Sequence, residues 1–200
     1  MALKKTRFGA SIQSALGSFF SHLPLTPNQL TVSAVAFAAV GFFLSLQQQA
    51  LPSLAFFTLA GAVDALDGAV ARARKQVTAR GAYIDGITDR LVEFLLVLSF
   101  FQYAIPPFIF PAVLSLICIL FFGSTMSSFA TAYAEHRHVA DAKKIACQPG
   151  ILPRAERLLM LFAAMLLIVV HPAFASITLF AEALLCAWTF FQRFWYYSKE

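Results

Sequence analysis

Four aspartates are the residues of this chain whose type and spacing could do chemistry. Asp64 and Asp67 are three residues apart, and Asp85 and Asp89 are four apart. Residues at these separations share one face of a helix, so two helices joined by a short connection could bring all four carboxylates together. Such a cluster needs cations, because like charges at close quarters repel. Carboxylate oxygens favour Mg²⁺ or Mn²⁺ over zinc or copper, so the pattern predicts a divalent-metal site that would bind phosphate oxygens.

Small residues on the same two helical faces support a ligand site. Gly68, Ala71 and Gly81 leave space where a ligand must approach the backbone. The alternative is that the aspartates only form ion pairs at a helix junction. The candidate partners are Arg72, Arg74, Lys75 and Arg80. Ordinary ion pairing requires neither the glycines nor the repeated four-residue step, so we favour the metal site.

The elements that must position these residues are membrane helices. Sixty per cent of the 200 residues are hydrophobic, which is typical of a membrane protein, and we expect a single domain spanning residues 1–200. Apolar runs near the length of about 20 residues that crosses a bilayer predict six spanning helices. They lie at about 29–47, 51–70, 91–110, 109–133, 157–175 and 173–192. The predicted fold is therefore all-α, a bundle of six transmembrane helices over residues 26–200.

Residues 1–25 are predicted to form an amphipathic helix on the membrane surface. Apolar residues such as Phe8, Ile12 and Phe19 recur there at helical spacing, after Lys4 and Lys5. A solvated helix packed on a partner is the alternative.

The positive charges predict the orientation in the membrane. All 15 Lys and Arg lie before the first predicted span, around the second and fourth connections, or after the sixth span. The positive-inside rule then places both termini and the aspartates on the cytoplasmic side. A net charge of +5 suits an anionic leaflet and anionic substrates, with no need for nucleic acid. The three cysteines are widely spaced and predict neither a zinc site nor a disulfide framework.

The motif D-x-x-D-G-x-x-A-R, eight residues, G-x-x-x-D-x-x-x-D, which runs from Asp64 to Asp89, resembles the signature of the CDP-alcohol phosphotransferase (CDP-alcohol phosphatidyltransferase) family at every specified position. The resemblance implies transfer of a phosphatidyl-type group from a CDP-linked lipid to an alcohol, with release of CMP. It also implies two divalent ions, Mg²⁺ or Mn²⁺, and a homodimer. Asp64, Asp67 and Asp85 would be metal ligands, and Asp89 a ligand that also acts as general base.

The same resemblance assigns residues to the CDP group of the lipid. Gly68 and Gly81 would give it room, and Arg72 would contribute charge. The P-N-Q-L-T stretch at residues 27–31 is similar to a motif ahead of the first span in many members, which would place Asn28 and Thr31 near the substrate. Helix capping explains these two residues equally well.

Arg154 and Arg157 bear on the acceptor alcohol. They are three residues apart at a predicted helix start, and paired guanidinium groups suit phosphate. The segment resembles the R-x-E-R-L element of the inositol-phosphate lipid synthases, where the arginines bind the phosphate of the incoming alcohol. Thr131–Glu135 departs from the arginine-containing run of that branch. Positive-inside anchoring is the alternative role.

We therefore interpret the chain as a membrane phospholipid synthase that uses inositol phosphate as acceptor, with glycerol 3-phosphate or serine as alternatives. The lipid could be based on diacylglycerol or archaeol. A cation-binding transporter is the competing class, but it predicts acids spread along a path through the bilayer. Here only Glu182 lies deep elsewhere. A catalytically silent scaffold is disfavoured by the intact signature.

Overall fold

The computed structural model describes residues 27–74, 76, 78–139, 141, 145 and 149–199, with side chains from residue 29 onward. These residues form helices, with no strand among them, so the all-α fold is confirmed. The surface helix expected over residues 1–25 lies outside the described part of the chain. The helices group into two compact units, one ending at Gln102 and one beginning at Tyr103.

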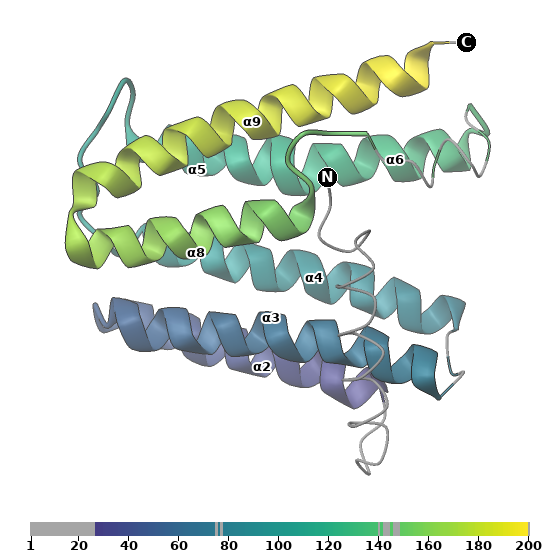
Figure 1. The fold of residues 1–200 in the computed structure, drawn as a ribbon, viewed down its shortest axis with the longest axis horizontal. Helices are drawn as coiled ribbons and strands as arrows, with labels where there is room; N and C mark the ends of the chain where they lie inside the picture. The colour runs from purple at the N-terminus through teal and green to yellow at the C-terminus, as the bar shows by residue number, and fades with distance from the viewer. Residues whose placement is uncertain are drawn as a thin grey trace. The chain divides into compact units, whose positions relative to one another are not determined.

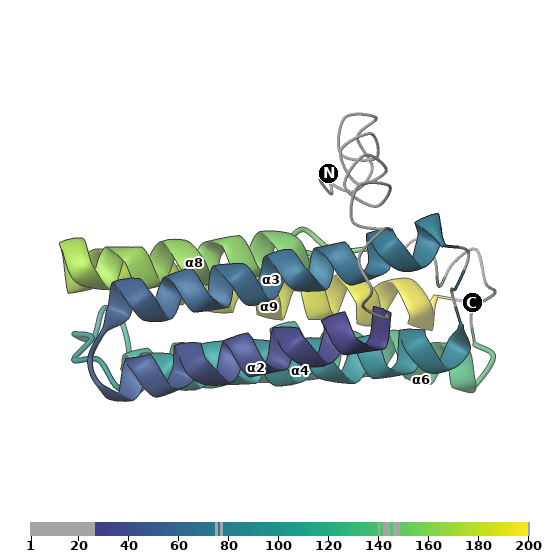
Figure 2. The ribbon, with the colours of Figure 1, turned by 90° about the horizontal axis from the view of Figure 1, so that it is seen from below.

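The first unit contains three helices: α2 (Pro27–Leu46), α3 (Ala50–Ala73) and α4 (Ala79–Phe100). α2 begins at a proline, which suits the first helical position because that position has no intrahelical N–H bond to lose. α2 lies alongside both α3 and α4 (Figures 1 and 2). The carboxyl end of α3 and the amino end of α4 are joined by only a few residues, so these two ends must lie near each other.

A glycine allows α2 and α3 to approach closely. The Ser53 hydroxyl of α3 donates a hydrogen bond of 2.7 Å to the carbonyl oxygen of Gly41 on α2. A Cβ atom on Gly41 would lie 3.0 Å from the Phe57 ring and 3.2 Å from the Ser53 carbonyl oxygen. This contact fixes the spacing of the two helices that carry Thr31 and the first aspartate pair.

The second unit is built around its last helix, α9 (Pro172–Ser198). α9 contacts each of the other helices of the unit. They are α5 (Ala112–Cys118), η2 (Ile119–Met126), α6 (Ser127–His136) and α8 (Arg154–Val170). The α5, η2 and α6 segments follow one another without a break, so together they form one long helix whose middle, η2, is a π-helix (Figure 1).

Prolines lie at two places where the observed helix boundaries differ from the predicted spans. The third predicted span, at 91–110, is wrong in position, because α4 begins at Ala79 and ends at Phe100. Pro106, Pro107 and Pro111 follow, and a proline inside a helix removes a hydrogen bond and clashes with the preceding turn. The next helix accordingly starts at Ala112. The fifth and sixth predicted spans correspond to α8 and α9, which are separated at Pro172, the first residue of α9.

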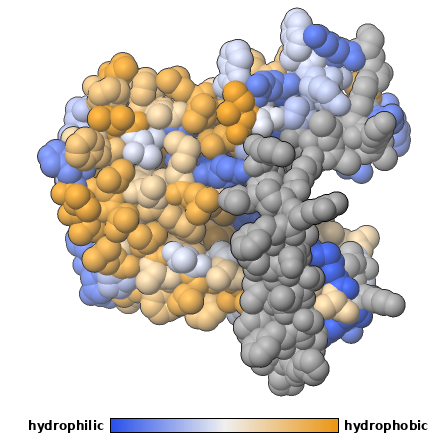
Figure 3. All heavy atoms as spheres, in the orientation of Figure 1, coloured by the Kyte–Doolittle hydropathy of each residue, from blue (hydrophilic) through white to orange (hydrophobic). Residues whose placement is uncertain are grey.

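Four helical stretches of the described chain are long and apolar enough to cross a membrane: Gln29–Leu46, Ala50–Ala73, Ala112–His136 and Pro172–Ser198. Two helices fall short of that measure, since α4 carries five charged residues and α8 has 17 residues. Apolar side chains cover much of the face seen in Figure 3. Large hydrophobic side chains are exposed in both units, among them Val32 and Phe43 in the first and Phe121 and Trp188 in the second. Such a surface suits contact with lipid.

Candidate functional site

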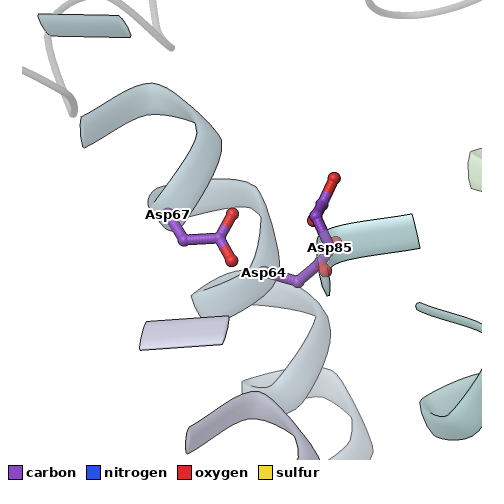
Figure 4. Close-up of side chains that lie close together, drawn as sticks. All are labelled: Asp64, Asp67 and Asp85. Carbon is purple, nitrogen blue, oxygen red and sulfur yellow. The ribbon is translucent and has the colours of Figure 1, made fainter. Parts of the chain in front are cut away.

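Three of the four predicted aspartates converge in the first unit. Asp64 and Asp67 lie near the carboxyl end of α3, and Asp85 lies in the second turn of α4. One carboxylate oxygen from each residue lies within 4.8 Å of the others. Figure 4 shows the Asp64 and Asp67 side chains on the same side of α3, toward Asp85. The helix-face argument from the sequence is thus confirmed for these three residues, which we call the aspartate triad.

Thr31 holds the most buried member of the aspartate triad. The Thr31 hydroxyl, on α2, donates a hydrogen bond of 2.5 Å to Oδ2 of Asp67. Both side chains are buried, with 5% and 4% of their surface exposed, whereas Asp64 and Asp85 are half-buried. A buried hydrogen bond of this kind fixes the direction of the carboxylate, as outer-shell partners of metal ligands do. The motif resemblance would place Thr31 near the substrate, with helix capping as the alternative, and it did not reveal this contact.

Asp89 lies outside the aspartate triad. It is half-buried on α4, one helical turn beyond Asp85, and its Oδ1 is enclosed by protein. Its predicted roles as fourth ligand and general base therefore remain predictions. The next acid on this face, Glu93, is fully buried, and its Oε2 lies 3.4 Å from Nη1 of Arg90 in an ion pair within α4.

The two glycines of the signature have different surroundings. A Cβ atom on Gly68 would lie 3.3 Å from Nη1 of Arg72, one turn later on α3, so Gly68 gives that guanidinium room to lie along the helix. Gly81 lies in the first turn of α4, and its N–H donates to the Thr78 hydroxyl at 3.0 Å. Thr78 caps the helix, which satisfies an N–H that has no partner within the helix. The side chain of Asn28 lies outside the described residues.

The donor set of the aspartate triad fits a divalent cation. Three carboxylates from two helices bring several hard oxygen ligands within a few ångströms, and no sulfur or imidazole ligand joins them in the described group. Their mutual repulsion favours binding of positive charge at this point. The aspartate triad could therefore hold Mg²⁺ or Mn²⁺, with Asp64, Asp67 and Asp85 as ligands.

Arg154 and Arg157 lie at the start of α8, in the second unit, as the sequence predicted. Arg157 is buried with 3% of its surface exposed, and Arg154 is half-buried. A Cβ atom on Gly123 of η2 would lie 2.9 Å from Cδ of Arg157, so only a glycine leaves room for the arginine there. The sequence alone did not reveal this contact.

Comparison with known proteins places the chain in a family. The family model for CDP-alcohol phosphatidyltransferase matches residues 24–191. The chain is 32% identical over 175 residues to an archaetidylinositol phosphate synthase from Methanothermobacter thermautotrophicus, covering 87% of this chain and 83% of that protein. It is 31% identical over 186 residues to an archaetidylinositol phosphate synthase from Pyrococcus horikoshii, covering 92% and 90%.

The fold is also similar to that of the Mycobacterium tuberculosis phosphatidylinositol phosphate synthase. Its crystal structure with CDP-DAG bound matches with a TM-score of 0.76 at 20% identity, covering 94% of each chain. Its structure with manganese and citrate matches with a TM-score of 0.75, covering 94% of this chain and 89% of the other. At this level of identity the similarity shows a shared fold.

The helical fold, the apolar helices and the aspartate triad together define a polytopic membrane protein with a candidate divalent-metal centre. This chain belongs to the CDP-alcohol phosphatidyltransferase family, and it is a transferase that makes phospholipid.

Proposed function

We propose that this protein transfers a phosphatidyl- or archaetidyl-type group from a CDP-linked lipid to inositol phosphate and releases CMP. The observation that carries the proposal is the convergence of Asp64, Asp67 and Asp85 in a chain of this family. Relatives named as archaetidylinositol phosphate synthases support an inositol phosphate as the acceptor.

The aspartate triad would bind two divalent ions, Mg²⁺ or Mn²⁺, together with Asp89. The bound ions would neutralise negative charge on the diphosphate of the lipid and ease the departure of CMP. Thr31 keeps Asp67 directed toward the site. Gly68, Gly81 and Arg72 are proposed to border the CDP group, together with Asn28 and Thr31. The nucleotide would then lie beside the α3–α4 connection and the first turns of α2.

The acceptor alcohol must lose a proton as its oxygen attacks phosphorus. We assign that proton to the carboxylate of Asp89, one turn beyond Asp85 on α4. The new bond joins the alcohol oxygen to the phosphorus of the lipid phosphate, and the bond that breaks joins this phosphorus to the oxygen of CMP. Asp89 returns the proton to solvent after the product leaves.

Arg154 and Arg157 are proposed to bind the phosphate of the acceptor. Arginine presents several N–H donors in a planar fork that matches phosphate oxygens, and α8 begins at Arg154, so the two side chains leave the same turn. This assignment favours inositol phosphate, or else glycerol 3-phosphate, over serine, which carries no phosphate.

The topology proposed for the whole chain has six spans, α4 and α8 among them, with both termini and the aspartates on the cytoplasmic side. A surface helix over residues 1–25 would precede the bundle, and two copies of the chain would form a homodimer. The distribution of Lys and Arg supports the orientation.

The reaction is tested with purified protein, Mg²⁺ and CDP-linked lipids carrying diacylglycerol or archaeol. The measurement is CMP release with inositol phosphate, glycerol 3-phosphate, serine or free inositol as the acceptor. We expect release with inositol phosphate that stops on chelation of the metal. In Asp85→Asn, CMP release should fall by a factor of about a hundred or more, the scale on which losing an essential charge-stabilising group lowers rates. If CMP were released with serine and with none of the other acceptors, inositol phosphate would be rejected as the acceptor. Undiminished CMP release after chelation would reject the metal site.

The acceptor site is tested by charge reversal. In Arg154→Glu, the KM for inositol phosphate should rise about tenfold or more, because a charge-assisted hydrogen bond of about 1.5–3 kcal/mol is lost. The KM for the CDP-linked lipid should stay near the wild-type value. Arg137→Glu is the matched control, since Arg137 is exposed at the end of α6 and lies over the ring of Tyr133. An unchanged acceptor KM in Arg154→Glu would reject the phosphate role.

A further inference from the structure

The carboxyl half of α9 carries an exposed aromatic groove. Its wall is formed by Trp188, Phe191, Gln192, Phe194 and Trp195. Residues at these spacings lie on one side of a helix, so the five side chains line a single hollow. The groove has a volume of about 370 Å³, within the range of about 300–1,000 Å³ that is usual for small-ligand sites. It belongs to the second unit, whereas the aspartate triad belongs to the first.

Ring contacts hold the wall of the groove against η2. The Phe191 ring lies 6.3 Å from that of Phe122 on η2, centroid to centroid, and the Phe190 ring lies 5.6 Å from the same ring. Gln192 is the polar member of the wall, and its Oε1 accepts a hydrogen bond from the Ile151 N–H at 3.1 Å. Because the polar end of Gln192 is engaged with the backbone, the groove presents an apolar surface.

A positive charge lies at one end of the groove. Nζ of Lys199 lies 5.1 Å from the centroid of the Trp195 ring, which is a cation–π contact. Lys199 directly follows Ser198, the last residue of α9, and is exposed. α9 is long and apolar enough to cross a membrane, so this end of the helix reaches the membrane surface. Lysine beside aromatic rings at such a position is typical of the boundary between hydrocarbon and headgroups.

The length of the groove matches one leaflet of a bilayer. Trp188 and Lys199 are 11 positions apart, which is about 16 Å along a helix. One leaflet contributes about 15 Å, half of the hydrocarbon core. A partner helix would need a matching surface across both leaflets, yet residues 181–187 contain no aromatic residue. A lipid chain occupies a single leaflet, so it fits the groove better than a second helix does.

The groove and Lys199 together match a ligand with a hydrocarbon chain and a negatively charged head. We propose that they bind one anionic phospholipid of the surrounding leaflet, with a chain along the groove and the phosphate at Lys199. On the orientation proposed above, this is the cytoplasmic leaflet, whose surface is negatively charged. The bound lipid needs neither a metal ion nor a CDP group, because the polar end of its site is a lysine. It is distinct from the CDP-linked substrate, which would bind at the aspartate triad.

Intrinsic fluorescence tests the site, because Trp188 and Trp195 are the two tryptophans of the chain. The full-length protein is reconstituted in phosphatidylcholine, and a growing fraction of the lipid is replaced by lipid with brominated chains, which quench tryptophan on contact. Brominated phosphatidylglycerol should reach half-maximal quenching at about a fivefold lower fraction than brominated phosphatidylcholine, the preference expected from one lysine near a membrane surface.

Substitutions at Lys199 test the role of the charge. In Lys199→Gln the preference for the anionic lipid should disappear, and Lys199→Arg should keep it. Arg137→Gln is the matched control, because Arg137 also lies over an aromatic ring, with its Cζ 5.8 Å from the centroid of Tyr133, at the end of a different helix. Arg137→Gln should keep the wild-type preference. Asp85→Asn should keep it too, since Asp85 belongs to the aspartate triad.

Single-tryptophan variants test the direction of the bound chain. Trp188→Phe leaves Trp195, which lies one turn from Lys199 and should be quenched most by bromine atoms near the headgroup. Trp195→Phe leaves Trp188, about 10 Å deeper along α9, which should be quenched most by bromine atoms farther down the chain. The reverse order would overturn the position assigned to the phosphate.

Other outcomes would also overturn the lipid site. Equal quenching of wild type by the two brominated lipids would show ordinary contact with the bilayer. Quenching by neither lipid would mean that protein covers the groove, and cross-linking of Phe191→Cys between copies would then identify a dimer contact. A preference that persisted in Lys199→Gln would remove the role of Lys199, and its loss in Asp85→Asn would place the detected lipid at the substrate site.

Discussion

At the scale of single residues, the contact between Thr31 and Asp67 connects α2 to the aspartate triad on α3 and α4. The hydrogen bond is 2.5 Å long and both residues are buried, so it forms without competition from water. A carboxylate held in this way is already oriented when a cation arrives. The triad is therefore assembled by all three helices of the first unit, although α2 contributes no acid to it.

Replacing Thr31 by Val should weaken Mn²⁺ binding. We expect a loss of about tenfold or more in affinity, the range found for partners that orient metal ligands. Thr31→Ser keeps the hydroxyl and should bind nearly as wild type. Mn²⁺ affinity can be measured by electron paramagnetic resonance titration, with and without CDP.

Thr58→Val is the matched control, because the exposed Thr58 hydroxyl bonds only within α3, to the carbonyl oxygen of Leu54. If Thr31→Val left Mn²⁺ affinity unchanged but raised the KM for the CDP-linked lipid, Thr31 would contact the nucleotide, as the sequence motif suggested, instead of orienting Asp67.

At the scale of elements, the π-helix η2 brings a glycine against the α8 and α9 side chains. A Cβ atom on Gly123 would lie 2.7 Å from Sγ of Cys186 and 2.9 Å from Cδ of Arg157. The turn after η2 carries a hydrogen bond of the wider π type, from the Ser127 N–H to the carbonyl oxygen of Phe122. π-Helical segments are rare and often lie at functional sites, which agrees with the acceptor role proposed for Arg157.

Alanine should have opposite effects at two helical glycines. Gly123→Ala should lower the free energy of unfolding by about 1–3 kcal/mol, because the methyl group overpacks the contact with Cys186 and Arg157. Gly86→Ala on α4 should raise it by about 0.5–1 kcal/mol, since alanine loses less backbone entropy in a helix. Nothing lies within 4 Å of a Cβ atom at Gly86.

The measurement is unfolding of the purified protein in detergent. Adding Cys186→Ala to Gly123→Ala should recover part of the loss, because it removes the nearer of the two crowded atoms. A Gly123→Ala variant as stable as wild type would mean that η2 relaxes its backbone to make room.

At the scale of the whole molecule, the charges divide the connections of the chain into two kinds. The α2–α3 connection, Gln47–Gln49, carries no Lys or Arg, whereas Arg74, Lys75 and Arg80 lie around the α3–α4 connection. These connections lie at opposite ends of α3, which is long and apolar enough to cross a membrane. The charge asymmetry predicts that the α3–α4 connection faces the cytoplasm.

Cysteine labelling tests this orientation. In a variant without the three native cysteines, Gln76→Cys should react with an impermeant maleimide only after the membrane is opened. Gln47→Cys should react in intact cells. Both positions are exposed, so access to the reagent depends on the side of the membrane. The cysteine-free parent is the control, and labelling of Gln76→Cys in intact cells would contradict the proposed topology.

The helical class, the membrane character and the three residues of the aspartate triad could all be predicted without a structure. Helix periodicity is a local property, so steps of three and four residues on two helices joined by a short connection predicted that four aspartates meet. The structure confirms this for Asp64, Asp67 and Asp85. The proline-rich stretch around Pro106 and Pro107 also signalled a break, although the predicted span ran through it.

The distant side chains that contact these residues could be identified only in the folded chain. Thr31 and Asp67 are 36 positions apart, and Arg193 and Ser127 are 66 apart, and no periodicity links such pairs. Their contacts arise because packed helices bring particular faces together, which depends on the shapes of many side chains at once. The space that Gly123 leaves for Arg157 has the same origin, because a glycine in an apolar helix shows its purpose only when its neighbours are in place.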